Sequence, residues 1–462
     1  MDGEIVKNLD KRHHESAEML PSWKKARHCR KGQTAIHKAG VTYLPKLSGQ
    51  SDDEYNAYKR RAVFYGAMSR TVDAFSGMIM RTPPQIDNEN VLLDDVTNTG
   101  ISLYDFTAEL LDEVLTEGFT AILVEHTPQT QAVTLGQAQA LGARPYLCKF
   151  KASAVLNWRM IKGLFIQAVL EEEEYIQVSE FESKERKIYR VLDLDEFGFY
   201  RQRKFVKSEQ SADEFVQIGD DIYPLMNGAK IQEIPLYFIG DVEELPPLID
   251  IVDLNISHYM STADLENGRH FTGLPTPVVS GVQLEEGKTL NIGSSAAWVF
   301  PQVEAKATYL EFTGKGLGSL EKALDTKEKQ MAALGARMLS ETIVQETATA
   351  ASLKSSGEFS VLAMTARTVG NTLTKACQFM YKWSGLGNVT ITLNTDFLPS
   401  KMSPLELQAL VQAWQAGALS YASMYAQLVQ GEIIAPGGSA EDEQAAVAES
   451  APVLTGGNDT TI

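Results

Sequence analysis

Helical spacing of apolar residues dominates the first part of the chain. Residues 51–54 have a capping-box pattern, and apolar and aromatic residues then recur every three or four positions until the proline pair at 83–84. This pattern predicts one long helix. A second helix is predicted from Ser102 to Gly118, and the short apolar run 119–125 that follows predicts a buried strand.

Residues 145–240 change to short β-prone segments separated by charged turns, which predicts an antiparallel meander. One of these segments begins with the acidic run Glu171–Glu174. Four adjacent carboxylates would repel one another if buried, so we expect this run to form a solvated face or a turn.

Two amphipathic helices are predicted in the second half, at 248–268 and 317–338. The segment 273–316 between them is rich in Pro and Gly and contains short strand-like pieces, which predicts a compact β-containing insertion. One face of the first helix carries polar residues at helical spacing. They are Asp250, Asp253, Ser257, Ser261 and Asp264.

The remaining pattern predicts further helices. Residues 341–357 are small or hydroxyl-bearing with little amphipathicity, so we expect a flexible loop there. Helical spacing then returns over 359–385, residues 389–393 alternate as a strand does, and 403–431 has the start and break signals of a helical hairpin. The fold class is therefore α+β, mainly α.

Charge changes the picture of what the chain can bind. The chain has 462 residues and a net charge of 42 − 60 = −18. That length predicts two to four domains or one elaborate fold, and the acidic charge argues against a protein that grips nucleic acid. The charge is uneven: the first 50 residues are basic, whereas 433–462 is acidic, small and polar, which predicts a disordered tail.

Cysteine spacing and hydropathy point to a reduced compartment. Cys29, Cys148 and Cys377 lie far apart and form no disulfide framework or zinc motif, and Cys377 falls on an apolar helical stripe, which favours core packing. The N-terminus has no apolar signal core, and no run approaches the length of a membrane span. We expect a soluble protein made inside a cell and used there or in a particle assembled there, with no membrane partner.

The motifs that carry enzyme chemistry are not found. Gly314–Ser319 fails the phosphate-loop spacing and is better interpreted as a helix start. His13, His14 and Glu15 are adjacent, but neighbouring side chains on a helix point in different directions. We therefore expect no catalytic residues, no cofactor and no metal site, although an enzyme with an unreadable site stays an alternative.

Several segments of the chain resemble segments of a tailed-bacteriophage portal protein, the head-to-tail connector, and they occur in the same order. The similarity runs from about Tyr55 to Gly431. Its best-matched segments are 58–65, 76–84, 117–124, 157–159, 247–259 with 280–281, 336–339 and 346–351. Together they imply a fold and an assembly more than the role of any one residue.

The resemblance implies a portal fold with a β-containing wing and clip, long stem helices and a ring-forming subunit. Mapped onto this chain, its parts are a wing at 1–245 with a basic N-terminal arm at about 1–50, stem helices at 246–271 and 317–340, a clip at 272–316, a tunnel loop at 341–357, a long helix and returning wing strand at 358–402, a helical crown at 403–432 and the acidic tail at 433–462.

The implied function is a conduit: a ring, usually a dodecamer, at one capsid vertex. Double-stranded DNA would pass through it without sequence readout, packaged by the terminase large subunit and later ejected. Major capsid or scaffolding protein and tail adaptor proteins would be the other partners, in a virion assembled in the host bacterial cytoplasm. The alternative is a capsid-associated oligomeric scaffold or adaptor without a DNA channel.

Two sets of residues are candidates for the channel surface. The polar face of the first stem helix, defined above, would line the channel, with a solvated outer face as the equal alternative. The tunnel loop would be the DNA-proximal element, with Lys354 as the phosphate contact and hydroxyls as weak partners; Glu346 has an alternative role in closing a loop or subunit contact. The loop candidates are Glu346, Thr347, Thr349, Ser352, Lys354 and Ser355.

The net charge of −18 is compatible with such a channel. DNA carries about one charge per 1.7 Å of axis, so a basic lining would hold phosphates and obstruct sliding. A mostly acidic or neutral lining repels the duplex from the wall and lets it move.

Overall fold

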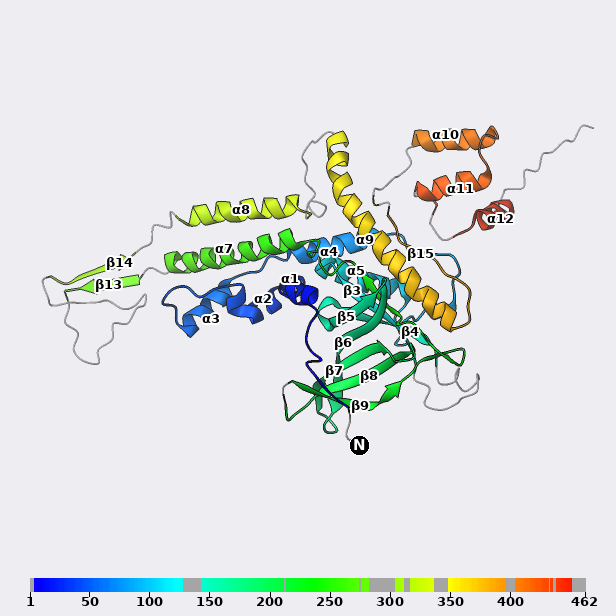
Figure 1. The fold of residues 1–462 in the computed structure, drawn as a ribbon. Helices are drawn as coiled ribbons and strands as arrows, with labels where there is room; N and C mark the ends of the chain where they lie inside the picture. The colour runs from blue at the N-terminus through cyan, green and yellow to red at the C-terminus, as the bar shows by residue number, and fades with distance from the viewer. Residues whose placement is uncertain are drawn as a thin grey trace, which may run out of the picture. The chain divides into compact units, whose positions relative to one another are not determined.

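The computed structural model describes residues 4–127, 143–211, 213–273, 276–281, 304–310, 316–335, 348–395, 397, 404–431, 433–434 and 438–450. The chain divides into two compact units, Met1–Met80 with Pro84–Leu393, and Arg81–Pro83 with Asn394–Ile462. Helices and strands are both abundant (Figure 1), so the α+β expectation is confirmed.

A six-stranded antiparallel sheet, in the order β1-β9-β8-β7-β6-β5, forms one part of the first unit. The strands are β1 Ile5–Lys7, β5 Val155–Ile161, β6 Leu164–Gln177, β7 Ser183–Leu194, β8 Tyr200–Lys207 and β9 Glu214–Ile222. From β5 to β9 each strand pairs with the next, which confirms the predicted meander. One face is closed by a cluster of buried side chains, Leu156, Val169, Tyr189, Val191, Phe205 and Phe215.

The acidic run Glu171–Glu174 lies within β6 and not in a turn. Its carboxylates are partnered across the sheet: Glu171 by Lys187, Glu174 by Arg186, and the half-buried Glu172 by Arg190. The solvated-face interpretation therefore holds only for the outer part of the run.

A second, three-stranded sheet has the order β12-β3-β4, with β3 Thr120–His126, β4 Pro145–Lys151 and β12 Leu236–Ile239. Its central strand is almost wholly buried, as the apolar run predicted. Helix α5, Leu103–Glu117, leads into it. Ser102 caps the helix by accepting a hydrogen bond from the Asp105 N–H, and Gly118 ends it in the left-handed conformation (φ +78°), which confirms both predicted ends.

The predicted long helix at 51–79 is wrong, because the structure has two helices there. They are α3, Asp52–Arg61, and α4, Ala67–Ile79. The capping box at Ser51 and Glu54 is present as expected. The break is stabilised by the buried side chain of Asn255, which bonds the backbone N–H of Met68 (3.3 Å) and the carbonyl of Tyr65. Backbone groups freed by the break are thus satisfied from elsewhere in the fold.

Residues before 50 also fold. They form α1, His14–Lys31, α2, Gln33–Ala39, and the short 3₁₀ turn η1, Gly40–Thr42. On α1 the side chains of Trp23, Ala26 and Cys29 are buried. The basic arm is therefore an integral part of the first unit.

The paired amphipathic helices are α7, Ile249–Gly273, and α8, Leu317–Ala333. The start of α8 agrees with a helix-start interpretation of the glycine-rich segment before it. Between the two helices, β13, Thr276–Ser280, and β14, Lys306–Leu310, pair as an antiparallel hairpin, which confirms a β-containing insertion. Residues 282–303 and 311–315 of the predicted clip lie outside the described residues.

Helix α9 runs from Ala348 to Trp383, so the expectation of a loop is wrong for residues 348–357. Amphipathic periodicity reports which side of a helix is packed, and a helical segment made of Ala, Ser, Thr, Leu, Lys and Gly need not show it. Residues 341–347 lie outside the described residues. Further along, α9 packs against the three-stranded sheet and against α5 (Figure 1).

Two 3₁₀ turns and two short strand pairs complete the first unit. The turns are η2 Val91–Leu93 and η3 Ala152–Ala154. The pairs are β2 Gln85–Ile86 with β15 Ile391–Thr392, and β10 Leu225–Met226 with β11 Ala229–Lys230. The strand predicted at 389–393 is therefore present in a shortened form.

The second unit contains α10, Pro404–Gln415, α11, Tyr421–Gln430, and α12, Ala440–Ser450. The predicted helical hairpin is confirmed by the first two. The predicted disorder of the tail is wrong for 440–450: Ser439 caps α12 by accepting from the Asp442 N–H (3.0 Å), and acidic residues fill its first turn. Residues 451–462 lie outside the described residues.

No helix in the described ranges combines the length and apolar character that crossing a bilayer requires.

Candidate functional site

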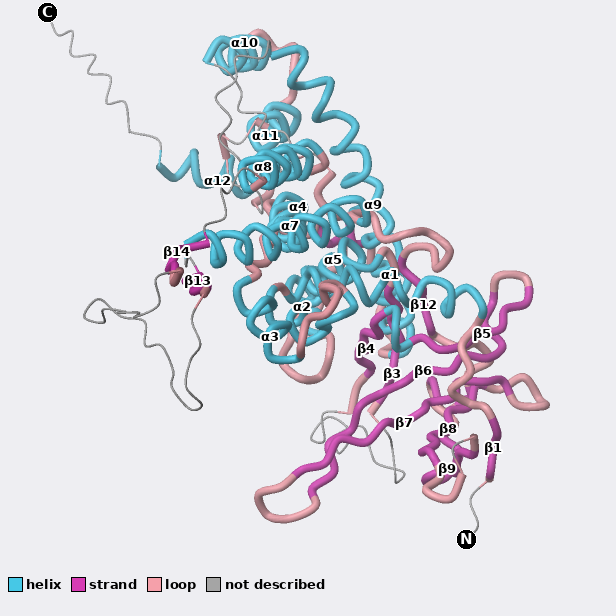
Figure 2. The backbone as a smooth tube through the Cα atoms, turned by 90° about the vertical axis from the view of Figure 1, so that its left-hand side faces the viewer, coloured by secondary structure: helices cyan, strands magenta, loops and turns pink. Residues whose placement is uncertain are grey.

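Helices α7 and α8 pack side by side in opposite directions (Figures 1 and 2). Lys327 Nζ donates to the Ser257 carbonyl (2.9 Å) and to Ser261 Oγ (2.7 Å), and Arg269 pairs with Glu321 (2.9 Å). Residue numbers rise along one helix as their partners fall along the other, which makes the pair antiparallel.

The contact between these helices is partly polar. His258, only 5% exposed, lies with Nε2 3.1 Å from Glu328 Oε1. Lys327 is half-buried, and its burial lowers the pKa of its amine, which the nearby Asp264 partly counteracts. Gly268 lets α8 approach closely, because a Cβ there would lie 2.6 Å from Leu317 Cδ2.

Most of the five polar residues of the α7 face have partners within the chain. Asp253 pairs with Lys25 of α1, Tyr58 of α3 donates to Asp264 Oδ1 (2.5 Å), and Ser261 accepts from Lys327 of α8. Ser257 contributes only its carbonyl to the same lysine, and Asp250 is exposed. The spacing thus identified a polar face correctly, but α1, α3 and α8 reach it from within the chain.

The hairpin that joins the helices is fixed at its described end. Its register runs from Thr276 opposite Leu310 to Ser280 opposite Lys306. Gly281 follows at φ +75°, where a Cβ would lie 2.7 Å from the Glu304 carbonyl oxygen. Only glycine allows that approach, so Gly281 keeps the two strands close at the end of their described pairing.

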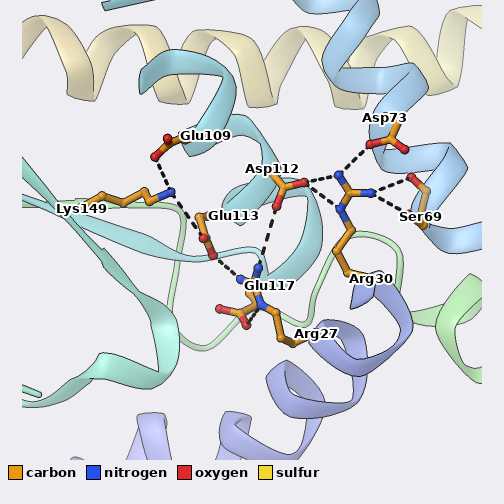
Figure 3. A network of polar contacts seen from close by, with 9 residues as sticks. All are labelled: Arg27, Arg30, Ser69, Asp73, Glu109, Asp112, Glu113, Glu117 and Lys149. Atoms are coloured by element: carbon orange, nitrogen blue, oxygen red, sulfur yellow. Dashed lines mark hydrogen bonds and ion pairs between the residues drawn. The ribbon is translucent and has the colours of Figure 1, made fainter. Parts of the chain in front are cut away.

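Helix α1 connects the α7–α8 pair to the sheets. Besides the Lys25 contact with Asp253, it carries Arg27 and Arg30, which lie in a network with acidic side chains of α4 and α5 (Figure 3). Arg27 Nε donates to Glu117 Oε1 (2.7 Å), and its Nη2 contacts Glu113.

Arg30 extends this network to α4. It bonds Asp112 Oδ1 (2.7 Å), Asp73 Oδ1 (2.6 Å) and Ser69 Oγ (2.6 Å), while Lys149 of β4 holds Glu109 (2.8 Å) on the far side (Figure 3). The network therefore joins α1, α4, α5 and β4.

Burial sets the electrostatics of this network. Burial raises the pKa of Glu117, against the opposing effect of the Arg27 hydrogen bond and charge. Arg27 keeps its proton, because the two glutamates raise its pKa by more than burial lowers it. All these side chains are engaged with each other, which fits a structural role.

The three cysteines are free, and burial raises the pKa of each thiol to about 12. A thiol in this state is protonated and a poor nucleophile. Cys377 is fully buried, which confirms its expected place in the core.

The tunnel-loop candidates divide between two regions. Glu346 and Thr347 lie outside the described residues. Thr349, Ser352, Lys354 and Ser355 lie in the first turns of α9, on a helix and not on a loop.

Sequence reasoning separated His13, His14 and Glu15, but the structure brings them together. Each of the three residues offers one potential metal-ligand atom, and these atoms all lie within 4.8 Å of one another. His13 precedes α1 in an extended conformation (ψ 146°), so the argument from helical directions does not apply to it. His13 also stacks on Trp158, with ring centroids 4.2 Å apart.

A family described as a domain of unknown function (DUF4055) matches residues 247–384, the segment from α7 to the end of α9. No curated protein matches the chain. Three solved chains of gene transfer agent (GTA) particles are similar. One, from the virion of the native particle, has 11% identity and a TM-score of 0.39, and the alignment covers 85% of this chain and 98% of that one.

The other two come from particle necks. A chain of the neck of the empty particle, computed with C6 symmetry, has 13% identity and a TM-score of 0.35 over 85% of this chain and 96% of that one. A chain of the neck of the native particle, computed with C12 symmetry, has 10% identity and a TM-score of 0.34 over 85% and 97%.

Proposed function

We propose that this chain is a portal protein: it forms a ring at one vertex of a phage-like capsid, through which double-stranded DNA is packaged by a terminase and later ejected, and it connects head to tail. Its partners would be further copies of itself, capsid or scaffolding protein and tail adaptors. The function requires no reaction of the chain's own.

The observation that carries this proposal is the α7, β13–β14, α8 arrangement. Two antiparallel helices joined by a β-containing insertion correspond to the stem and clip that the sequence resemblance implies for the same residues. The correspondence supports the proposal because contacts between the two helices and the pairing of the hairpin strands hold these elements together.

Anchoring of the stem supports the same function. A channel wall must keep its angle to the rest of the subunit, and α7 is held by α1 through Lys25 and by α3 through Tyr58. The arginine network then fixes α1 on α5. Head-to-tail contacts between such subunits close by rotation into a ring.

The exposed side of the stem fits a duplex that slides. Since α1, α3 and α8 already contact four of the five polar residues of the α7 face, we assign the channel-facing side to α8, which exposes charges of both signs. Its exposed charged residues are Glu321, Lys322, Asp325, Glu328 and Lys329. A mixed lining, like the net charge of −18, opposes tight phosphate binding.

Negative-stain imaging and native mass measurement of the purified chain test the proposal. A closed ring with a central hole is the expected result. An oligomer without a hole would favour a scaffold or adaptor, and a monomer at every concentration would overturn the ring.

The start of α9 is the proposed DNA-proximal element, with Lys354 as the phosphate contact. Lys354→Ala is expected to leave ring assembly unchanged and to reduce DNA packaging or retention, with Arg367→Ala, which removes an exposed cation further along the same helix, as the matched control. Normal packaging by the Lys354 variant would refute the assignment.

A further inference from the structure

The β6–β7 hairpin extends beyond the sheet to which it belongs (Figure 2). β5 pairs with β6 only as far as Leu170, and β8 pairs with β7 only from Tyr189 back toward Leu194. Residues 171–188 are therefore a two-stranded ribbon. Such a ribbon is marginally stable alone in water, and here the ion pairs Glu171–Lys187 (2.7 Å) and Glu174–Arg186 (2.5 Å) bridge its strands.

The tip of this ribbon is a hydrogen-bonded turn that exposes one aromatic side chain. The Val178 N–H donates to the Glu182 carbonyl (2.8 Å), and Gln177 Nε2 donates to the carbonyls of Ser179 (2.8 Å) and Glu180 (3.0 Å). This fixed turn presents Phe181 with 91% of its surface exposed. An exposed aromatic side chain on an ordered turn has little conformational freedom to lose on binding, which is typical of a contact site.

An apolar groove lies at the other end of β6. It has a volume of about 600 Å³ and is formed by the β5–β6 turn, by residues from Gln232 to Phe238 that lead into and begin β12, and by Thr372 and Lys375 of α9. Ile161 and Leu164 beside this turn are 57% and 65% exposed. Its principal apolar lining is Met160, Ile161, Leu164, Phe165, Tyr237 and Phe238.

The tip and the groove cannot meet within one chain. The 14 residues of β6 separate them, which at about 3.3 Å per residue is roughly 43 Å along a rigid strand. The tip and the groove of one chain therefore cannot cover each other, whereas two copies of the chain can each offer one of these surfaces to the other.

Charge at the two surfaces is complementary. The tip carries Glu180 and Glu182, and the groove carries Lys162 and Lys375 at its border. The described residues give none of these four side chains an ion-pair partner. The groove's own carboxylate, Glu233, is already paired with Lys382 (3.4 Å).

We propose that the tip of one chain, centred on Phe181, occupies the groove of a second copy. The contact is head-to-tail, since each copy uses a different surface, and it repeats around a closed ring. The inference rests on the proposed function in that the second copy is the neighbouring ring subunit.

Photo-crosslinking locates the contact directly. Benzoylphenylalanine at position 181 is expected to crosslink to peptides containing 160–166 or 234–238. A mixture of isotopically light and heavy chains shows whether the product joins two copies. Crosslinks within one chain, or only to other regions, would overturn the proposal.

Substitution tests the energetics. Phe181→Glu is expected to raise the concentration at half-assembly at least about tenfold, whereas Val91→Glu, at another exposed apolar position, leaves it unchanged. Circular dichroism and the melting temperature of the unassembled chain check that both variants fold. Unchanged assembly by Phe181→Glu would count against the tip.

Mixing two variants distinguishes head-to-tail contact from other modes. Phe181→Glu retains its groove, and Leu164→Glu retains its tip, so a mixture has one working contact and is expected to yield a dimer that cannot grow. Growth of the mixture to full rings refutes the inference while leaving the ring proposal intact. A monomeric wild-type chain refutes the ring itself.

Discussion

Arg27 offers the sharpest test of how the first unit is held together. Its guanidinium is the cation shared by Glu113 and Glu117, whose side chains are only 4% and 3% exposed. Arg27→Met keeps much of the side-chain volume but removes the charge, so Glu117 stays buried without its cation and Glu113 keeps only Lys149, whose Nζ lies 3.6 Å away.

Removing one partner of a buried ion pair costs about 3–5 kcal/mol. At roughly 2 °C per kcal/mol for a large unit, the melting temperature should fall by about 6–10 °C near neutral pH, as measured by scanning calorimetry. Arg269→Ala, which removes an exposed cation that also contacts two glutamates, is the matched control and should leave the melting temperature nearly unchanged.

The effect should depend on pH with a definite sign. Without Arg27, burial raises the pKa of Glu117 still further above its unfolded value. A carboxyl group with a raised folded pKa favours the folded state when it is protonated. The variant therefore regains stability as pH falls through that pKa, and the difference in melting temperature between the variant and the wild type becomes smaller. Adding Glu113→Gln and Glu117→Gln should restore much of the loss. The reasoning is refuted if Arg27→Met lowers the melting temperature no more than Arg269→Ala does, or if the difference from wild type grows in acid.

Two further substitutions test the backbone. Asn255→Leu leaves the backbone groups at the α3–α4 break unsatisfied and should destabilise the unit by about 2–4 kcal/mol in urea unfolding; a change below 1 kcal/mol, about one weak hydrogen bond, would contradict this role. Gly240→Ala puts a Cβ 2.0 Å from the Gly118 carbonyl oxygen at φ +84°, whereas in Gly268→Ala the new Cβ meets only the movable end of Leu317. The first should lower the melting temperature far more than the second, and equal effects would show that β12 and β3 can separate freely.

Elements whose signals are local were predictable from the sequence. Helix α5 has a serine cap at one end and a left-handed glycine at the other, and both signals act within a few residues. The two helices around the hairpin were predictable because each buries one stripe against the other.

The sequence predictions that were wrong or missing concern features that depend on residues distant in the sequence. Apolar spacing continues through the α3–α4 break, and only Asn255, some 190 positions away, supplies the hydrogen bonds that make a break acceptable. Helix α1 was missed because its buried face mixes Trp23 and Cys29 with arginines, and those arginines are tolerable only beside the acidic residues of α5. The gathering of His13 with its neighbours likewise depends on an extended residue that spacing does not reveal.

The polar face of α7 shows which part of a functional site residue spacing can predict. Spacing placed its five residues on one side of a helix, but it carries no information about what covers that side. In the structure Lys25 contacts Asp253 and Tyr58 donates to Asp264, so these two exposed acids help to position the helix. A substitution such as Asp253→Ala would therefore remove a contact that positions the stem together with a surface charge. The residues to vary for channel charge are those exposed on α8, where Lys322 and Lys329 can be changed without removing a contact to α7.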